Sequence, residues 1–137
     1  MDKIFIDTNA LVALNNSSDT LHNKALETAK KLNTGTYLYY IGLNILIETL
    51  TIVSQRCGKK QANALLKELR SGTYTIINPL QEDIIVAEEI FVSAKSKNLS
   101  YSDCLSFAIM KTRNILQTFS FDIHFKKQGF KRFNIDK

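Results

Sequence analysis

The sequence predicts an α/β fold, a parallel sheet between helices, on two observations. Short apolar segments typical of strands alternate with longer amphipathic segments typical of helices along all 137 residues. The first strand, Ile4-Phe5-Ile6, has apolar residues at consecutive positions, as expected where both faces are covered. We therefore expect a three-layer sheet protein with one domain over residues 1–137, an ordinary length for a single domain.

The first half of the chain alternates strand and helix. After the first strand, a helical turn over 12–14 leads into a loop, and Ser18 or Asp19 is placed to cap a helix over 21–32, whose apolar residues recur at helical spacing. Asn33-Thr34-Gly35 ends that helix, and the aromatic run 37–41 favours a second strand. Asn44 is placed to cap a helix over 43–57, which Gly58 ends.

The second half repeats the pattern. A helix over 59–70 ends at Gly72, and a third strand over 74–77 ends at Asn78-Pro79. Helices over 81–96 and 101–112 precede a fourth strand over 115–119, and 133–135 is a candidate fifth strand. Two helices thus separate the second and third strands, and again the third and fourth. A wholly parallel sheet requires each pair to fold as a hairpin.

Composition favours a cytoplasmic protein with a polyanionic partner. The chain is 45% hydrophobic and 23% charged, with a formal net charge of +5. Its two cysteines, Cys57 and Cys104, lie far apart without nearby His or Cys, which argues against a disulfide scaffold or a zinc site. The chain begins with a charged pair and a strand, so we expect no signal peptide. The apolar segment 45–53 is interrupted by Glu48 and is too short to span a bilayer.

Four acidic residues are expected at one edge of this sheet. Asp7 ends the first strand, and Asp122 follows the fourth. Glu48 lies in the first turns of the helix that leaves the second strand, and Asp103 begins the helix before the fourth strand. In open α/β folds this carboxyl edge is where sites are built.

Each acid also has a simpler explanation. Asp7 could cap the next helix, and Ser100-x-x-Asp103 has the spacing of a helix capping box. Glu48 could be an exposed position on an otherwise apolar helix, and Asp122 a turn residue. These explanations are independent of one another, so one shared cause accounts better for all four at one edge.

A hard divalent cation is that shared cause. Carboxylates held close together repel, and they take up protons unless positive charge intervenes. Mg²⁺ or Mn²⁺ prefers oxygen ligands, and it can activate a water and stabilise a phosphoryl group. Since the sequence contains no Walker loop and no recognisable serine hydrolase elbow, phosphodiester hydrolysis is the chemistry that best matches these residues.

The chain resembles the PIN-domain ribonucleases, and within them the VapC-like toxins of type II toxin–antitoxin systems. The matching segments occur in the family's order over nearly the whole chain: Phe5 to Leu14, Asn44 to Leu50, Leu99 to Leu105 and Ser120 to Phe125. The resemblance implies a five-stranded parallel sheet of order 3-2-1-4-5. It also implies RNA cleavage, a homodimer and inhibition by a cognate antitoxin protein.

The resemblance also assigns roles to residues. Asp7, Glu48, Asp103 and Asp122 would be the catalytic residues that hold Mg²⁺ or Mn²⁺, and Asp122 stands at the position where the family varies most. Asn9 and Ser120 would support them through hydrogen bonds. Two departures are mild: Cys104 stands where the family commonly has Ala, and Ser120 where it usually has Thr.

A nuclease with an acidic cleft needs basic groups nearby to hold a phosphate backbone. The candidates are Lys111, Arg113, Lys126 and Lys127, in a C-terminal segment with few acids. Three alternatives to an RNA-cleaving toxin stay open: a PIN-domain nuclease of RNA processing without an antitoxin, an aspartyl phosphatase-like hydrolase with Asp7 as nucleophile, and a non-catalytic binding module. Against the phosphatase, Asn9 occupies the position where such enzymes usually have a second Asp.

Overall fold

The structure is a computed structural model that describes all residues 1–137. Its sheet contains five strands in the order β3-β2-β1-β4-β5, and every adjacent pair is parallel, as predicted. The strands are β1 (Asp2–Ile6), β2 (Tyr37–Gly42), β3 (Tyr74–Ile77), β4 (Gln117–Phe119) and β5 (Lys131–Arg132). The helices are α1 (Thr8–Asn15), α2 (His22–Asn33), α3 (Leu43–Cys57), α4 (Lys59–Leu69), α5 (Gln81–Ser93), α6 (Tyr101–Thr112) and α7 (Ile123–Lys127).

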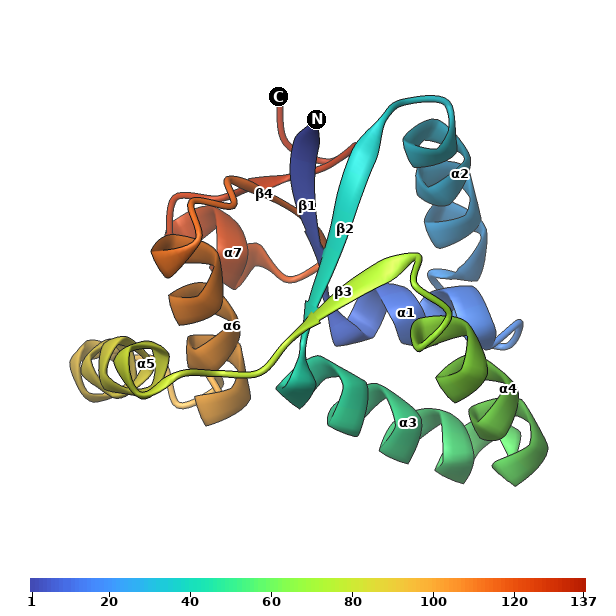
Figure 1. Ribbon diagram of the computed structural model, residues 1–137, viewed down its shortest axis with the longest axis horizontal. Coiled ribbons are helices and arrows are strands. Elements are labelled where there is room, and N and C mark those ends of the chain that lie inside the picture. Colours follow the sequence, from blue (N-terminus) through green and yellow to red (C-terminus); the bar gives the residue numbers. More distant parts are fainter.

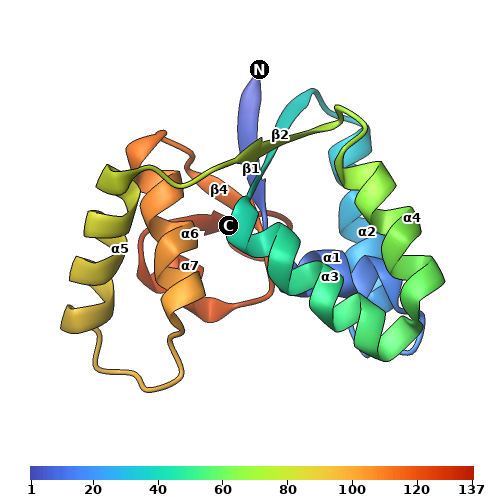
Figure 2. The same ribbon diagram turned by 60° about the horizontal axis from the view of Figure 1, so that its bottom comes forward.

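Helices cover both sides of the sheet. Figures 1 and 2 show α1, α2 and α4 on one side of the strands and α5, α6 and α7 on the other. The central strand β1 is accordingly apolar and buried from Ile4 to Ile6. On the second side, the ring of Phe107 in α6 meets Phe125 edge-on at a centroid distance of 4.9 Å and stacks on Phe130 at 6.1 Å. These aromatic contacts anchor α7 to the core.

Both predicted helix pairs fold as hairpins. The α3–α4 turn consists of Gly58 alone, which adopts a φ of +95° that residues with a side chain rarely adopt. Helices α5 and α6 also pack against each other, and the longer segment 94–100 connects them. The reversal returns the chain to the amino edge of the sheet, which keeps β3 and β4 parallel to β1.

Several predicted boundaries were wrong. Helix α1 spans eight residues rather than one turn, and α5 ends at Ser93. Helix α7 was missed, β4 begins only at Gln117, and the fifth strand is Lys131–Arg132 rather than 133–135. The aromatic and β-branched residues of 133–135 favour a strand, but Asn134 adopts a φ of +63°, which breaks extended structure.

Two predicted helix caps were also wrong. Helix α2 begins at His22 after Leu21, and Asp19 Oδ1 accepts a hydrogen bond from the Leu21 N–H in the preceding turn instead of capping the helix. Asn44 lies inside the first turn of α3 and does not cap it. Its Nδ2 donates to Ser102 O at 3.0 Å and to Ser106 Oγ at 3.0 Å, so it joins the start of α3 to the start of α6.

Candidate active site

The carboxyl edge of the sheet carries a hollow of about 290 Å³, here called the acidic hollow. It is lined by Asp7, Thr8, Asn9, Val12, Asp19, Leu21, Glu48, Ile52, Arg56, Asp103 and Asp122. All four acids that the sequence singled out are among these residues. They come from four different parts of the fold: the end of β1, α3, the first turn of α6 and the cap of α7.

Asp7 is the most deeply buried of these acids, with 5% of its surface exposed. Its backbone N–H pairs with Phe119 O at 3.0 Å, so β1 and β4 fix its position. Burial raises the pKa of the Asp7 carboxyl to about 7, against the lowering effect of hydrogen bonds from Ser120 and the Thr8 backbone. The negative charges of Asp103 and Asp122 raise this pKa further, which places the three carboxyl groups within electrostatic reach of one another.

A hydrogen-bond network links the ends of β1 and β4. The Ser120 hydroxyl donates to Asp7 Oδ2 at 2.7 Å and accepts from the Asp122 N–H at 3.1 Å. Asn9 Nδ2 donates to the same hydroxyl at 3.3 Å, and Asn9 Oδ1 accepts from the Phe121 N–H at 3.2 Å. Ser120 thus uses its one proton on Asp7, and Asn9 fixes the orientation of the chain between Ser120 and Asp122.

In each of the other three acids, one carboxylate oxygen accepts hydrogen bonds from the protein. Asp103 Oδ2 accepts from the Ser100 N–H at 3.0 Å in a capping box, while Asp122 Oδ1 accepts from the His124 N–H at 2.9 Å. Glu48 Oε1 accepts from the Thr8 hydroxyl at 2.8 Å. The second oxygen of each group has no hydrogen-bond donor from the protein. Capping therefore does not exclude a second role, because it occupies only half of each carboxylate.

This donor set fits a hard divalent cation. The hollow offers carboxylate oxygens without protein donors beside the Asp7 carboxyl, whose pKa is raised mainly by burial and further by the charges of Asp103 and Asp122. Nearby positive charge stabilises the ionised form of such a group. As the side chains stand, no three His, Cys, Asp or Glu residues form a ready-made metal cluster. Binding would therefore draw the carboxylates closer together.

Three polar residues of the hollow were not predicted from the sequence to belong to the site: Thr8, Asp19 and Arg56. Arg56 is its only cationic side chain. A signal for it existed, because Glu48, Ile52 and Arg56 are spaced by four and therefore share one face of α3. Asp19 lies in the loop before α2, where the sequence carries no comparable signal.

The four candidate phosphate contacts lie in different places. The guanidinium of Arg113 is bound to Asp83, at 2.8 Å to Oδ1 and 3.0 Å to Oδ2. Arg113 O also accepts from Lys3 Nζ at 3.2 Å, which places Arg113 at the amino edge of the sheet, about 15 Å from Asp103 along α6. Lys111, near the same end of α6, donates to Gln128 Oε1 at 3.0 Å.

Lys126 and Lys127 lie on α7, which begins beside Asp122. Both are exposed. Lys126 Nζ is 3.9 Å from Asp136 Oδ1, and Lys127 makes no ion pair. Of the four candidates, these two lie within five residues of Asp122, although neither lines the acidic hollow.

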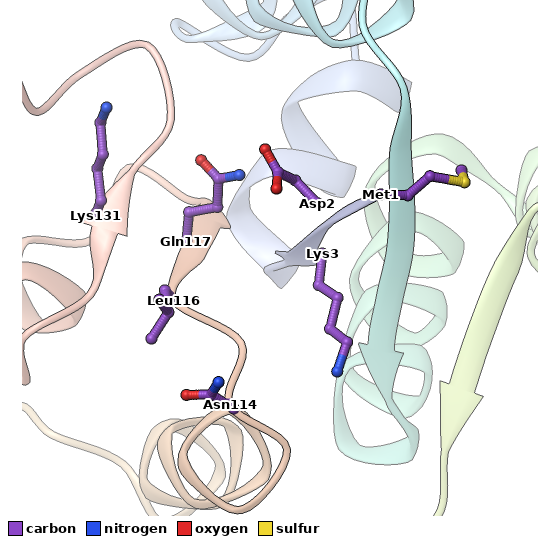
Figure 3. A pocket seen from close by; sticks show the side chains of 7 residues that line it. All are labelled: Met1, Asp2, Lys3, Asn114, Leu116, Gln117 and Lys131. Atoms are coloured by element: carbon purple, nitrogen blue, oxygen red, sulfur yellow. The ribbon is translucent and has the colours of Figure 1, made fainter.

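A further hollow lies at the opposite, amino edge of the sheet (Figure 3). It is lined by Met1, Asp2, Lys3, Asn114, Leu116, Gln117 and Lys131. The side chains of Lys3 and Lys131 point in different directions in Figure 3, and Asp2 is the only carboxylate there. This hollow brings no acids together, so it is not a candidate metal centre.

The sheet order and the acid-lined hollow at its carboxyl edge define the class as a PIN-like α/β protein. Comparison with known proteins agrees: the chain belongs to the PIN domain family, which it matches over residues 4–131. It is 32% identical over 129 residues to the 23S rRNA-specific endonuclease VapC20 of Mycobacterium tuberculosis, in strains CDC 1551 and H37Rv, covering 93% of this chain and 95% of the relative.

Solved structures agree with this assignment. The crystal structure of Mycobacterium tuberculosis VapC20, described as a sarcin-ricin loop cleaving toxin, is similar with a TM-score of 0.83 and 27% identity over 93% of this chain and 95% of that one. FitAcB from Neisseria gonorrhoeae shares the fold, with a TM-score of 0.70 and 18% identity over 96% of both chains. The resemblance to VapC-like PIN-domain proteins is thereby confirmed.

Proposed function

We propose that this protein is a PIN-domain RNA endonuclease that uses Mg²⁺ or Mn²⁺, and that residues 1–137 form its nuclease domain. The observation that carries the proposal is the meeting of four acids from four elements in one hollow at the carboxyl edge of the sheet. The relationship to VapC20, an endonuclease, supports the same activity. Large-subunit ribosomal RNA is therefore the first substrate to test.

Asp7, Glu48, Asp103 and Asp122 would hold the cation. When bound, the cation would lower the pKa of a water and neutralise charge that develops on the phosphoryl group. The protein's own groups set the geometry: Ser120 fixes one oxygen of Asp7, and Thr8 fixes one oxygen of Glu48. Burial raises the pKa of the Asp7 carboxyl to about 7, so the group is only partly ionised at neutral pH, and positive charge beside it would favour the ionised form.

RNA would reach the acids past basic side chains. Lys126 and Lys127 are exposed on α7, the short helix that Asp122 caps, and are the proposed phosphate contacts. For Lys111 and Arg113, their side-chain partners and their place at the amino edge favour a structural role.

The experiment is a cleavage assay with purified protein and RNA. We expect cutting with Mg²⁺ or Mn²⁺, none in EDTA, and a loss of at least about 100-fold in Asp7→Asn and Asp103→Asn with the fold retained. Asp2→Asn, at the exposed start of β1, is the matched control and should cut normally. Full activity in either active-site variant would reject the metal assignment. A trapped phosphoaspartate at Asp7 would instead indicate a phosphatase.

We further propose that the protein is a toxin, as VapC20 is described to be. Inhibition by an antitoxin protein and a homodimer are what the family resemblance implies, and we propose a cytoplasmic location from the composition of the chain. No helix of the structure combines the length and the apolar character needed to cross a bilayer. Exposed apolar side chains on α5, including Phe91 and Val92, offer a surface for a second copy. Light scattering of the purified protein would give its mass in solution.

A further inference from the structure

A second hollow, here called the polar hollow, adjoins the acidic hollow. Its volume is about 410 Å³, and it is lined by Leu14, Asn15, Asn16, Ser17, His22, Arg56, Cys57 and Gln61. Arg56 lines both hollows, so the two meet at its side chain.

The same two helices border both hollows in succession. Along α1, Thr8 and Val12 face the acidic hollow, and Leu14 and Asn15 face the polar one. Along α3, Glu48 and Ile52 precede Arg56 and Cys57 in the same way. Helices α1 and α3 pack against each other and run side by side in Figure 2. The hollows therefore form one path that leads away from Asp7.

The charges along this path change sign. The acidic hollow contains five carboxylates, at Asp7, Asp19, Glu48, Asp103 and Asp122, whereas no Asp or Glu lines the polar hollow. A phosphate group away from the cation is repelled by the first and attracted by the second. The boundary between them is Arg56.

The guanidinium of Arg56 is free to bind a phosphate. It is exposed and makes no hydrogen bond or ion pair with the protein. By contrast, the guanidinium groups of Arg113 and Arg132 are bound to Asp83 and Asp136. A planar guanidinium without a carboxylate partner can bind phosphate oxygens with two parallel hydrogen bonds.

The polar hollow also has hydrogen-bond acceptors on fixed side chains. His22 Nδ1 lies 2.7 Å from Ala13 O, and since a carbonyl only accepts, Nδ1 carries the proton and Nε2 can accept in the neutral ring. Asn15 Nδ2 donates to Leu11 O at 2.8 Å, and Gln61 Nε2 donates to Asn15 O. Their side-chain oxygens are left for partners outside the protein. Nucleobase amino groups and ribose hydroxyls are donors of the matching kind.

We propose that the polar hollow is a subsite for a nucleotide that flanks the cleaved bond of the RNA, and that Arg56 binds the phosphate between this nucleotide and the cleaved bond. The inference rests on the proposed nuclease function and adds the path that the RNA would follow away from the cleaved bond.

The test compares Arg56→Ala with wild type on a single-stranded RNA oligonucleotide of about 12 nucleotides that carries a mapped cleavage site. We expect KM to rise about tenfold with kcat little changed, as for one lost charged hydrogen-bonded contact. The slope of log affinity against log salt should fall by about one. Arg56→Lys should recover part of the affinity. Arg70→Ala, which removes an exposed arginine at the far end of α4, should match wild type.

Substrates shortened from either end locate the subsite. On the one that lacks the flanking nucleotide, wild type and Arg56→Ala should cut equally well. An unchanged KM and salt slope in Arg56→Ala, or an equal loss in Arg70→Ala, would overturn the inference while the nuclease function stands. If wild type cuts no RNA, anisotropy of the labelled oligonucleotide with Asp7→Asn and Asp7→Asn/Arg56→Ala still tests Arg56, because equal binding would reject it.

Discussion

At the scale of single residues, the proposed function needs the Asp7 carboxylate to be charged, whereas its burial makes that charge destabilising. Its side chain is almost fully buried, and its pKa of about 7 exceeds the ordinary value of 3.8 because burial disfavours the charged form. In the unfolded chain the carboxyl ionises near pH 4, whereas in the fold it ionises only near pH 7. Without a cation, this group therefore destabilises the fold progressively as the pH rises from 4 to 7, and the full cost remains above pH 7.

Asp7→Asn should accordingly make the metal-free protein more stable while it abolishes cleavage. Asn keeps an oxygen for the Ser120 hydroxyl but cannot ionise, so we expect a gain of about 2 kcal/mol in the free energy of unfolding at pH 8 and little gain at pH 4. Urea denaturation in EDTA at both pH values measures it, with Asp2→Asn as the exposed control on the same strand. A less stable Asp7→Asn at pH 8 would contradict the argument.

At the scale of helices and strands, the α5–α6 hairpin is held by a buried ion pair. Asp83, in the first turn of α5, is fully buried and accepts from Arg113, from Thr112 Oγ1 at 2.6 Å and from the Leu80 N–H at 2.8 Å. Burial alone would raise the pKa of Asp83, but these hydrogen bonds and the charge of Arg113 outweigh it and hold the pKa at about 2.

Asp83→Ala should lower the free energy of unfolding by about 3 kcal/mol at pH 7, because it leaves Arg113, Thr112 and the Leu80 N–H without their partner. The pKa of Asp83 is lower in the fold than its ordinary 3.8, so its contribution is present above pH 4 and is lost as the pH falls towards 2. Urea denaturation at pH 7 and pH 2.5 should show the difference between wild type and variant shrinking. Glu82→Ala, at the exposed neighbouring position, is the control, and equal stability of Asp83→Ala and wild type at pH 7 would refute the role.

Which elements the sequence could predict follows from their length and period. Helices α3 and α6 and strand β3 have the predicted bounds, because long apolar periodicity or flanking glycine and proline mark their ends. Helix α7 has only five residues, too few to show a period, and it depends on the Asp122 cap and on Phe125 packing against Phe107. Its formation therefore rests on tertiary contacts that no local pattern carries.

At the scale of the whole molecule, the parallel topology explains why separated acids could be grouped from sequence. Strands β1, β2 and β4 end at one edge, so residues that follow them meet there. Asp103 could be grouped with them because α6 begins at that edge and runs back to the amino edge before β4. The positions of the strand ends do not predict Arg56, which reaches the hollow from the last turn of α3, eight residues beyond Glu48.

The four acids come from separate elements and meet only in the folded chain, so cation binding should increase the stability of the fold. A cation that binds only the folded protein adds about 2.7 kcal/mol to the free energy of unfolding at a concentration 100 times its dissociation constant. When Mn²⁺ is added to the metal-free protein, the melting temperature should therefore rise in wild type and in Asp2→Asn. The double variant Asp7→Asn/Asp103→Asn should not respond, because it lacks carboxylates from both β1 and α6. An equal rise in the double variant would mean that the cation stabilises the fold from outside the acidic hollow.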